Sequence, residues 1–197
     1  APKARRSPPS PTTPARRSAQ TALWHITQAM LRWMAPFLSF TAEEAWAVFA
    51  PGGSGTVFTE TYWAFASPDE ALLAKWARIR DVRDAVNKEI EAVRASGGLG
   101  SSLQANVSIH ANPQDHALLA SLGDALKLVL ITSAAELHAD RSGDTAALGI
   151  QVTPSTATKC ARCWHWRDDV GHDPAHPGLC GRCTSSLFGA GERREVA

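Results

Sequence analysis

The chain has 197 residues, enough for one or two domains with apolar cores of their own. Its apolar content of 44% and charged content of 20% are ordinary for a globular protein, and its net charge of +1 excludes a large uniform basic surface. Contact with a nucleic acid must therefore come from a local patch. Since no apolar run reaches the roughly 18 residues of a spanning helix, we expect no membrane partner and a cytoplasmic location.

The first 17 residues, APKARRSPPSPTTPARR, are rich in proline and basic residues and contain no acid and no large apolar side chain. Such a segment cannot bury enough surface to offset the entropy that it loses on ordering. We therefore expect residues 1–17 to be a disordered, basic leader. A basic arm that touches RNA is the alternative function for this segment.

Three helices are predicted between Ser18 and Gly100. The first ends at Pro36, which cannot continue a helix. The second begins in TAEEAWAVF with Thr41 as its N-cap, and the third begins in SPDE and ends at the SGG that follows Arg94. The apolar stripes of the first and third helices are Leu23, Ile26, Met30, Met34 and Phe37, and Leu72, Trp76, Ile79, Val86, Ile90 and Val93. These three helices are predicted to form a small bundle.

After Gly100 the pattern changes to shorter segments. SLQANVSIH alternates apolar and polar residues and predicts a strand, QDHALLASLGDAL predicts a short helix, and KLVLIT and LGIQVTP predict two further strands. Residues 101–155 are therefore predicted to form a small α/β connector, which is too short to be comfortably stable alone.

All four cysteines lie in KCARCWHWRDDVGHDPAHPGLCGRC, residues 159–183, as two Cys-x-x-Cys pairs. Two residues between cysteines let one tight turn present both sulfurs to one metal ion, and a second such turn completes a tetrahedron. The predicted ligands of one structural Zn²⁺ are Cys160, Cys163, Cys180 and Cys183. Because protein fills all four positions, no water is left for catalysis. The alternatives are disulfides or free thiols, or a nitrogen ligand from His165, His172 or His176.

The complete fold prediction is a mainly α protein with three parts after the leader. These are a helical bundle at residues 18–100, the α/β connector at 101–155, and a zinc ribbon-like module at 156–197. A zinc ribbon does not define a function by itself, because such modules bind nucleic acid, hold a partner or merely close a fold.

Three motifs together indicate a family. KCARCWHW, followed by LCGRC and the tail GERREVA, resembles the C-terminal zinc module of bacterial isoleucyl-tRNA synthetase. MAPFLSFTAEEAW, residues 34–46, resembles the signature of the anticodon-binding helical domain in class I synthetases for aliphatic amino acids, and VRDAVNKEIEAVR with GSSLQANV resembles the segment that follows that domain. The resemblance runs from about Ser18 to Ala197 and leaves residues 1–17 unmatched.

Members of this family also carry a catalytic domain with His-Ile-Gly-His and Lys-Met-Ser-Lys-Ser motifs, and this sequence contains neither motif. We therefore expect the chain to be a C-terminal fragment of such an enzyme that lacks the ATP and amino-acid catalytic core. The resemblance implies ATP as a cofactor of the full-length enzyme only, and a separate catalytic chain as one partner of this chain.

The resemblance further implies binding to isoleucine acceptor tRNA at its anticodon stem and loop, with weak, salt-sensitive affinity for this chain alone. The implied tRNA-contacting residues are Arg80, Arg83, Asn87, Arg94, Arg162, Trp164, Trp166, Arg167, Arg182, Arg193 and Arg194. For the helical residues the alternative is a solvated, ion-paired face, and for the two tryptophans it is packing over the zinc turns. The rival functions are a structural zinc module that docks on a partner, and nucleic-acid binding by a zinc finger of the DNA-repair glycosylase type.

Overall fold

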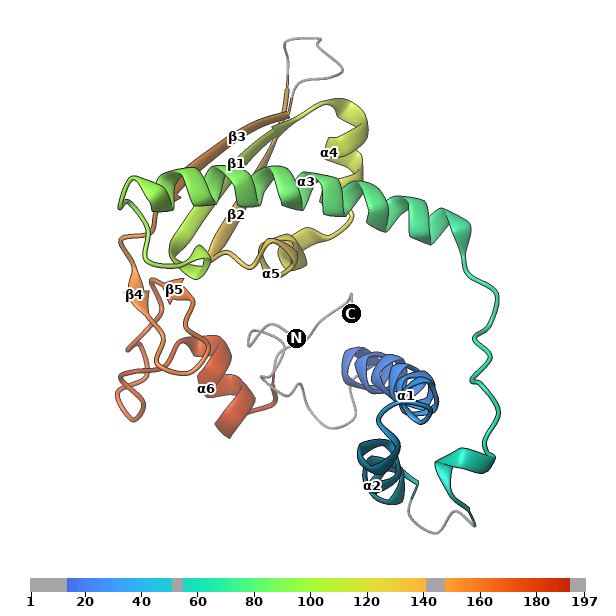
Figure 1. Ribbon diagram of the computed structural model, residues 1–197. Helices are drawn as coiled ribbons and strands as arrows, with labels where there is room; N and C mark the ends of the chain where they lie inside the picture. The colour runs from blue at the N-terminus through green and yellow to red at the C-terminus, as the bar shows by residue number, and fades with distance from the viewer. Residues whose placement is uncertain (1–13, 51–54, 141–147, 192–197) are drawn as a thin grey trace. The chain divides into compact units, whose positions relative to one another are not determined.

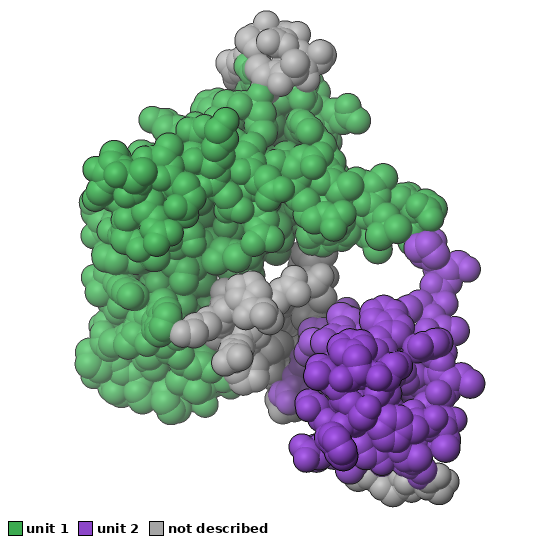
Figure 2. All heavy atoms as spheres, viewed as in Figure 1, with its two compact units in different colours: residues 1–11, 69–196 green, residues 12–68, 197 purple. Residues whose placement is uncertain are grey.

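The computed structural model describes residues 14–50, 55–140 and 148–191 (Figure 1). The chain divides into two compact units (Figure 2): unit 1 contains residues 69–196 together with 1–11, and unit 2 contains residues 12–68 together with Ala197. No helix among the described residues is long and apolar enough to cross a membrane.

The described residues of unit 2 form two helices and one short helical turn. These are α1 at Pro14–Met34, α2 at Ser39–Phe49 and the 3₁₀ turn η2 at Val57–Thr59. Helix α1 begins four residues earlier than predicted, because a proline is well tolerated at the first helical position, where its missing N–H has no partner to lose. The predicted leader is therefore helical at residues 14–17, and its remainder, residues 1–13, lies outside the described residues.

The core of unit 2 is small. Its buried apolar side chains are Leu31, Ala35, Ala42, Trp46 and Val57. Arg32 is buried beside them, where its guanidinium carbon lies 4.7 Å from the ring centroid of Trp46 and its Nη2 lies 2.5 Å from a carboxylate oxygen of Glu60. Through this ion pair and the contact with the Trp46 ring, Arg32 links the segment that carries Glu60 to α1.

The predicted core stripe of the first helix is wrong for most of its residues. Leu23, Ile26 and Met30 are 60%, 48% and 48% exposed, and of the stripe only Met34 packs against the unit 2 core. The helix carries apolar residues on two opposite faces, and the periodicity of the sequence does not show which of the two is covered.

Unit 1 is built around a helix on a sheet. Helix α3, Glu70–Ala95, lies across one face of a three-stranded sheet with the order β2-β1-β3 (Figure 1). Strand β1, Ala105–Ala111, pairs in parallel with β2, Ala134–Ala139, and antiparallel with β3, Leu148–Pro154. The shorter helices α4, Pro113–Ala120, and α5, Leu126–Leu130, contact β2, and the 3₁₀ turns η3, Ser102–Gln104, and η4, Gly123–Ala125, complete the connections.

One apolar core joins α3 to the sheet. The buried residues are Ile79, Val82, Val86, Ile90, Leu99, Ala105, Val107, Ile109, Ala111, Leu119, Leu122, Leu126 and Leu130. On β1 the buried residues alternate with partly exposed ones, as expected of a strand with one covered face. The prediction of a three-helix bundle is therefore corrected: the third helix packs against the sheet of unit 1, whereas the first two form unit 2.

Several local predictions also change. KLVLIT was predicted as a strand, but Leu126–Leu130 form helix α5, which ends at Ile131 in the left-handed region with φ of 60°. The missing strand is β2, which sequence alternation does not mark. Thr41 lies inside α2 rather than at its N-cap, and α3 is capped by Asp69, whose carboxylate accepts the backbone N–H of Leu72. The mainly α class is confirmed, because the structure is mostly helical.

The C-terminal module of unit 1 contains two very short strands and one helix. These are β4 at Thr158–Lys159, β5 at Trp166–Arg167 and α6 at Gly181–Phe188. The two strands pair in an antiparallel hairpin, and α6 follows a long turn. This module holds all four cysteines, which form a separate buried cluster.

Candidate metal centre

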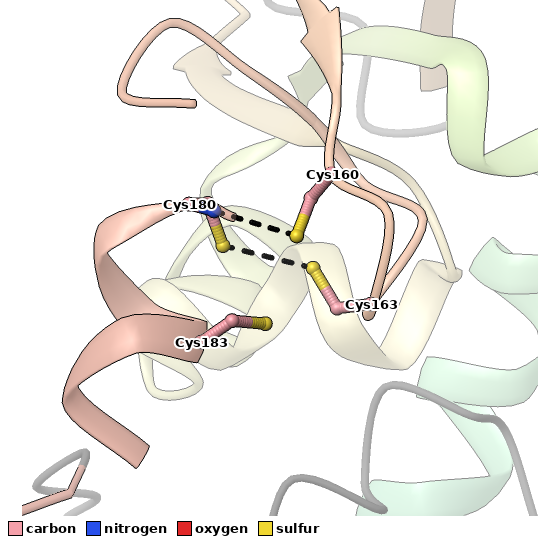
Figure 3. A group of neighbouring side chains, drawn as sticks. All are labelled: Cys160, Cys163, Cys180 and Cys183. Atoms are coloured by element: carbon pink, nitrogen blue, oxygen red, sulfur yellow. Dashed lines mark hydrogen bonds between the residues drawn. The ribbon is translucent and has the colours of Figure 1, made fainter. Parts of the chain in front are cut away.

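The four cysteine sulfurs point toward one another (Figure 3). Their Sγ atoms all lie within 4.8 Å of one another, and all four residues are buried. The sulfurs of Cys163 and Cys180 are 3.7 Å apart, and the backbone N–H of Cys180 donates to the sulfur of Cys160 at 3.4 Å. Among the described residues, no other group of three or more His, Cys, Asp or Glu side chains has this geometry.

Two different turns place the sulfurs. Cys160 and Cys163 lie in the β4–β5 turn, which is closed by a hydrogen bond of 2.9 Å from the backbone N–H of Cys160 to the carbonyl of His165. Cys180 is the N-cap residue of α6, and Cys183 lies in the first turn of that helix. The partial positive charge of a helix N-terminus favours thiolates at these two positions.

This geometry fits a structural Zn²⁺. Four sulfurs at about 2.3 Å from a central ion, arranged as a tetrahedron, are about 3.8 Å from one another. The Cys163–Cys180 separation of 3.7 Å agrees with this edge length. A set of four thiol donors is the preferred ligand set of structural zinc, and it leaves no position for a reacting water.

The thiols shift one another's pKa values even without a metal ion. The hydrogen bond between their sulfurs lowers the pKa of Cys163 and raises the pKa of Cys180. Burial raises the pKa of Cys183. The cluster alone therefore does not favour four thiolates, whereas a divalent cation at its centre stabilises all four negative charges.

Basic side chains surround the sulfurs, as the four-thiolate site requires. Arg162 makes a hydrogen bond that opposes the rise in the pKa of Cys183, and the charge of Arg182 contributes to the low pKa of Cys163. Arg167 instead pairs with Asp169, with Nε 2.7 Å from the carboxylate. The other oxygen of Asp169 accepts the backbone N–H of Gly181 at the start of α6, so this ion pair joins the two cysteine turns.

The histidines of the module are not part of the sulfur cluster, which contains only cysteines among the described residues. His165 is buried, and its Nδ1 lies 3.2 Å from the carbonyl of Cys163. Its hydrogen bonds contribute to the lower pKa of Cys163, so His165 acts on a ligand candidate rather than replacing one. The ring of His176 stacks on Phe188 with centroids 3.9 Å apart.

The two predicted RNA-contacting tryptophans differ. Trp164 is 41% exposed and adopts a left-handed φ of 67°, which is rare for a bulky residue. Its indole N–H donates to the carbonyl of Ala161, and the ammonium of Lys159 lies 5.4 Å from its ring centroid. Trp166 is half-buried, and its backbone N–H donates to Ser133 Oγ at 2.7 Å. Trp164 therefore presents a fixed ring to solvent, and Trp166 mainly joins the module to β2.

The four candidate residues on α3 also differ in exposure and in ion pairing. Arg80 is exposed, and no ion pair is found for it among the described residues. Arg83 and Asn87 are half-buried. Arg94 pairs with Glu91 at 3.1 Å, as the ion-paired alternative predicted. The remaining candidates, Arg193 and Arg194, lie outside the described residues.

Sequence reasoning missed two residues that hold the module in place. Ser133 Oγ accepts the backbone N–H of Trp166 and donates to the carbonyl of Leu103, so it bridges the module and the sheet. Asp169 links the two cysteine turns, because its carboxylate pairs with Arg167 and accepts the backbone N–H of Gly181. The Arg-x-Asp spacing around Asp169 is the one local signal that could have indicated its role.

Comparisons with known families agree with this geometry. The family described as "Anticodon-binding domain of tRNA ligase" matches residues 2–109, and the family described as "Zinc finger found in FPG and IleRS" matches residues 158–185. The first match corrects the expectation that residues 1–17 resemble nothing in the family. The second includes all four cysteines but is shared by two kinds of protein, and the anticodon-binding match disfavours the glycosylase alternative.

Individual relatives give the same assignment. The chain is 59% identical over 192 residues to an isoleucine–tRNA ligase of Ralstonia pickettii and 57% identical over 194 residues to one of Cupriavidus necator. It is 56% identical over 191 residues to isoleucine–tRNA ligase 1 of Burkholderia pseudomallei. Each match covers 95% of this chain and 20% of the relative, so the chain spans about a fifth of the length of these enzymes. Since the anticodon-binding family matches more than half of the chain, the chain belongs to that family of tRNA ligase domains.

Proposed function

We propose that this chain binds the anticodon stem and loop of isoleucine acceptor tRNA as the C-terminal part of an isoleucine–tRNA ligase. The observation that carries the proposal is the presence of both family matches on one chain. The amino-acid and ATP chemistry belongs to the part of the relatives outside the matched fifth, whether it is on the same polypeptide or on a separate catalytic chain. The same proposal places the chain in the cytoplasm, where tRNA is charged.

In this proposal Cys160, Cys163, Cys180 and Cys183 hold one structural Zn²⁺. The metal does not react with RNA. It fixes the turn that carries Trp164, and that exposed ring can stack on an unpaired base while the ammonium of Lys159 lies close enough to reach a phosphate. Arg162 and Arg182 lie beside the sulfurs and balance the negative charge of about −2 that four thiolates and one Zn²⁺ carry.

On α3 the proposal selects Arg80 as the strongest candidate for a phosphate contact. It is exposed and has no ion-pair partner among the described residues, whereas Arg94 is already paired with Glu91. Arg83 and Asn87 lie within the same sector of the helix and are half-buried. Their side chains are therefore less able than that of Arg80 to extend to a phosphate, and more suited to orienting the RNA. Phosphate contacts of this kind are few, so the affinity of this chain alone is weak and falls with salt.

The test is tRNA binding measured by fluorescence anisotropy over a range of salt concentrations. We expect binding at low salt, and Arg80→Glu should weaken it several-fold and reduce the salt slope by about one. Lys75→Glu is the matched control, because Lys75 lies on the same helix α3 but on another side. Trp164→Ala should weaken binding with little change in the slope, because a stacked ring releases no counterion.

Two results would contradict the proposal. If the zinc-loaded chain does not bind tRNA even at low salt, the module serves to dock on a protein partner rather than to bind RNA. If Arg80→Glu and Lys75→Glu weaken binding equally, the effect reflects net charge and not a contact at Arg80.

A further inference from the structure

The face of the sheet that points away from its apolar core carries two histidines side by side. Strands β1 and β2 are parallel neighbours, and His110 pairs in register with His138. Both side chains are exposed, on the side of the sheet opposite to the buried Ile109. The two imidazole rings stack, with centroids 4.8 Å apart and an angle of 23° between their planes. We refer to His110 and His138 as the histidine pair.

Acidic side chains lie beside the histidine pair. Because the side chains of a strand alternate between its two faces, Glu136 and His138 point to the same side of β2. A carboxylate oxygen of Glu136 lies 3.7 Å from Nε2 of His138. Asp140 lines the same open hollow of about 550 Å³ as the histidine pair. Two carboxylates beside two imidazoles favour a cation at this place and disfavour a phosphate, so the histidine pair is not a further contact for RNA.

Strand β3 leaves space on the other side of His110. The residue of β3 in register with His110 is Gly149. A Cβ atom at Gly149 would lie only 3.3 Å from the Cβ of His110. Because glycine has no such atom, the exposed ring of His110 has room to turn.

We propose that the histidine pair binds a divalent transition-metal ion of the class of Ni²⁺, Cu²⁺ and Zn²⁺, with Glu136 as a third ligand. Imidazole nitrogen is a preferred donor for these ions. Two donors that share one ion at about 2.1 Å are about 3–3.5 Å apart, which is close to the 3.7 Å between His138 and Glu136.

Binding requires one change in the histidine pair. The plane of a ligating imidazole contains the ion, so two stacked rings cannot share an ion until one of them turns about its Cβ–Cγ bond. This torsion has broad energy wells in histidine, and both rings are exposed, so the turn costs little.

This second site binds more weakly than the cysteine cluster. Four buried thiolates enclose an ion completely, whereas two imidazoles and one carboxylate on an exposed strand leave the other positions to water. We therefore expect the purified chain to hold zinc at the cysteines alone and to take up the second ion when it is added. The inference goes beyond the proposed function and requires neither tRNA nor a catalytic chain.

The experiment adds Ni²⁺ to the full, zinc-loaded chain, prepared without a histidine tag. Ni²⁺ is the probe because imidazole binds it well and because, unlike Cu²⁺, it does not oxidise thiols. Isothermal titration calorimetry gives the stoichiometry and the affinity, and the paramagnetic broadening of NMR signals locates the ion. We expect one Ni²⁺ per chain, broadening centred on His110 and His138, and no release of zinc.

Four variants connect the binding to the histidine pair. His110→Gln and His138→Gln should each weaken Ni²⁺ binding at least about tenfold, because one of two nitrogen ligands is lost. Glu136→Gln should weaken it by a smaller factor, since imidazole is the better donor for this ion. His116→Gln is the matched control: His116 lies on helix α4 of the same unit, and its replacement should leave the affinity unchanged. Each variant should keep one zinc per chain, which shows that it is folded.

Three results would overturn the proposal. The first is the absence of Ni²⁺ binding to the zinc-loaded chain. The second is binding that His110→Gln and His138→Gln leave unchanged, which would place the ion elsewhere. The third is the release of one zinc for each Ni²⁺ bound, which would assign the ion to the cysteine cluster. Loss of tRNA binding in the anisotropy assay would leave each of these results unchanged.

Discussion

The α3–sheet core and the cysteine module belong to the same unit, but different side chains hold them together. Thirteen buried apolar residues form the core between α3 and the sheet. In the module the buried cluster consists of four cysteines, and the apolar side chains packed against it among the described residues are Val170 and Leu179. A core of the first kind is stabilised by burial of apolar area, whereas a module with so little apolar area needs a metal to offset its ordering entropy.

Removal of the metal should produce the largest difference in stability between the two regions. Structural Zn²⁺ contributes on the order of 10 kcal/mol of apparent binding free energy in small modules, and for such modules this is folding free energy. Treatment with a strong chelator should therefore melt residues 158–188 and leave the α3–sheet core folded. Hydrogen exchange would show which residues lose protection, and elemental analysis should give one zinc per chain before treatment.

The substitution Cys183→Ser tests the same point without a chelator. It should remove zinc and unfold the module, while Ser186→Ala on the same helix α6 should keep one zinc per chain, because Ser186 belongs to no ligand group. A purified chain with no metal and with its cysteines quantitatively in disulfides would refute the zinc assignment.

A cavity in the apolar core should destabilise the α3–sheet region and leave the zinc in place. Ile90 is 1% exposed in the core between α3 and the sheet. Replacing a buried isoleucine with alanine typically costs about 2–5 kcal/mol, because apolar contacts are lost and a cavity is left. Ile90→Ala should lower the midpoint of urea unfolding and leave the zinc content at one per chain. If the zinc is lost together with the stability, the two regions unfold as one.

A partly buried ion pair gives the third contrast, which depends on pH. Arg78 donates to both oxygens of Asp115 at 2.8 and 2.6 Å, and these hydrogen bonds hold the pKa of Asp115 below its usual value. A carboxyl group with a lower pKa in the folded state stabilises that state above its unfolded pKa of about 4, and the contribution is lost as the pH falls. The pair therefore stabilises unit 1 at neutral pH and not in strong acid.

Asp115→Asn should lower the free energy of unfolding by about 1–3 kcal/mol at pH 7, toward the lower value because Arg78 is half-exposed. The difference between the variant and the parent should shrink toward zero near pH 3, as measured by urea unfolding at each pH. A difference that is the same at both pH values would mean that the charge of Asp115 contributes nothing.

The two regions also differ in how far the sequence predicts them. The cysteine cluster is encoded locally: two turns with fixed spacing bring Cys160, Cys163, Cys180 and Cys183 together, and the structure places their sulfurs within 4.8 Å. The position of α3 is not encoded in this way. Its apolar stripe is correct at Ile79, Val86 and Ile90, but a stripe does not show whether a sheet or other helices cover it.

Short apolar segments were the least predictable. KLVLIT has the composition of a strand, yet it is too short for periodicity to distinguish a strand from a buried helical turn. In the structure this region forms helix α5, and Leu126 and Leu130 of that helix are buried in the apolar core. Strand β2 follows in AAELHA, where alternation is weak, and its pairing with β1 defines it. Both errors lie between elements that were predicted correctly, so the topology of the sheet required the three-dimensional structure.

The smallest expected effect concerns the join between the two regions. Ser133 Oγ accepts the backbone N–H of Trp166 from the module and donates to the carbonyl of Leu103 beside the sheet. Ser133→Ala should lower the free energy of unfolding by only about 1 kcal/mol, because one buried hydroxyl and its hydrogen bonds are lost. Its larger effect should be local: the amide of Trp166 should exchange faster, while the zinc content and the protection of the β1 amides stay unchanged. A slower or unchanged amide at Trp166 would mean that the zinc alone orients the module, and that Ser133 does not join it to the sheet.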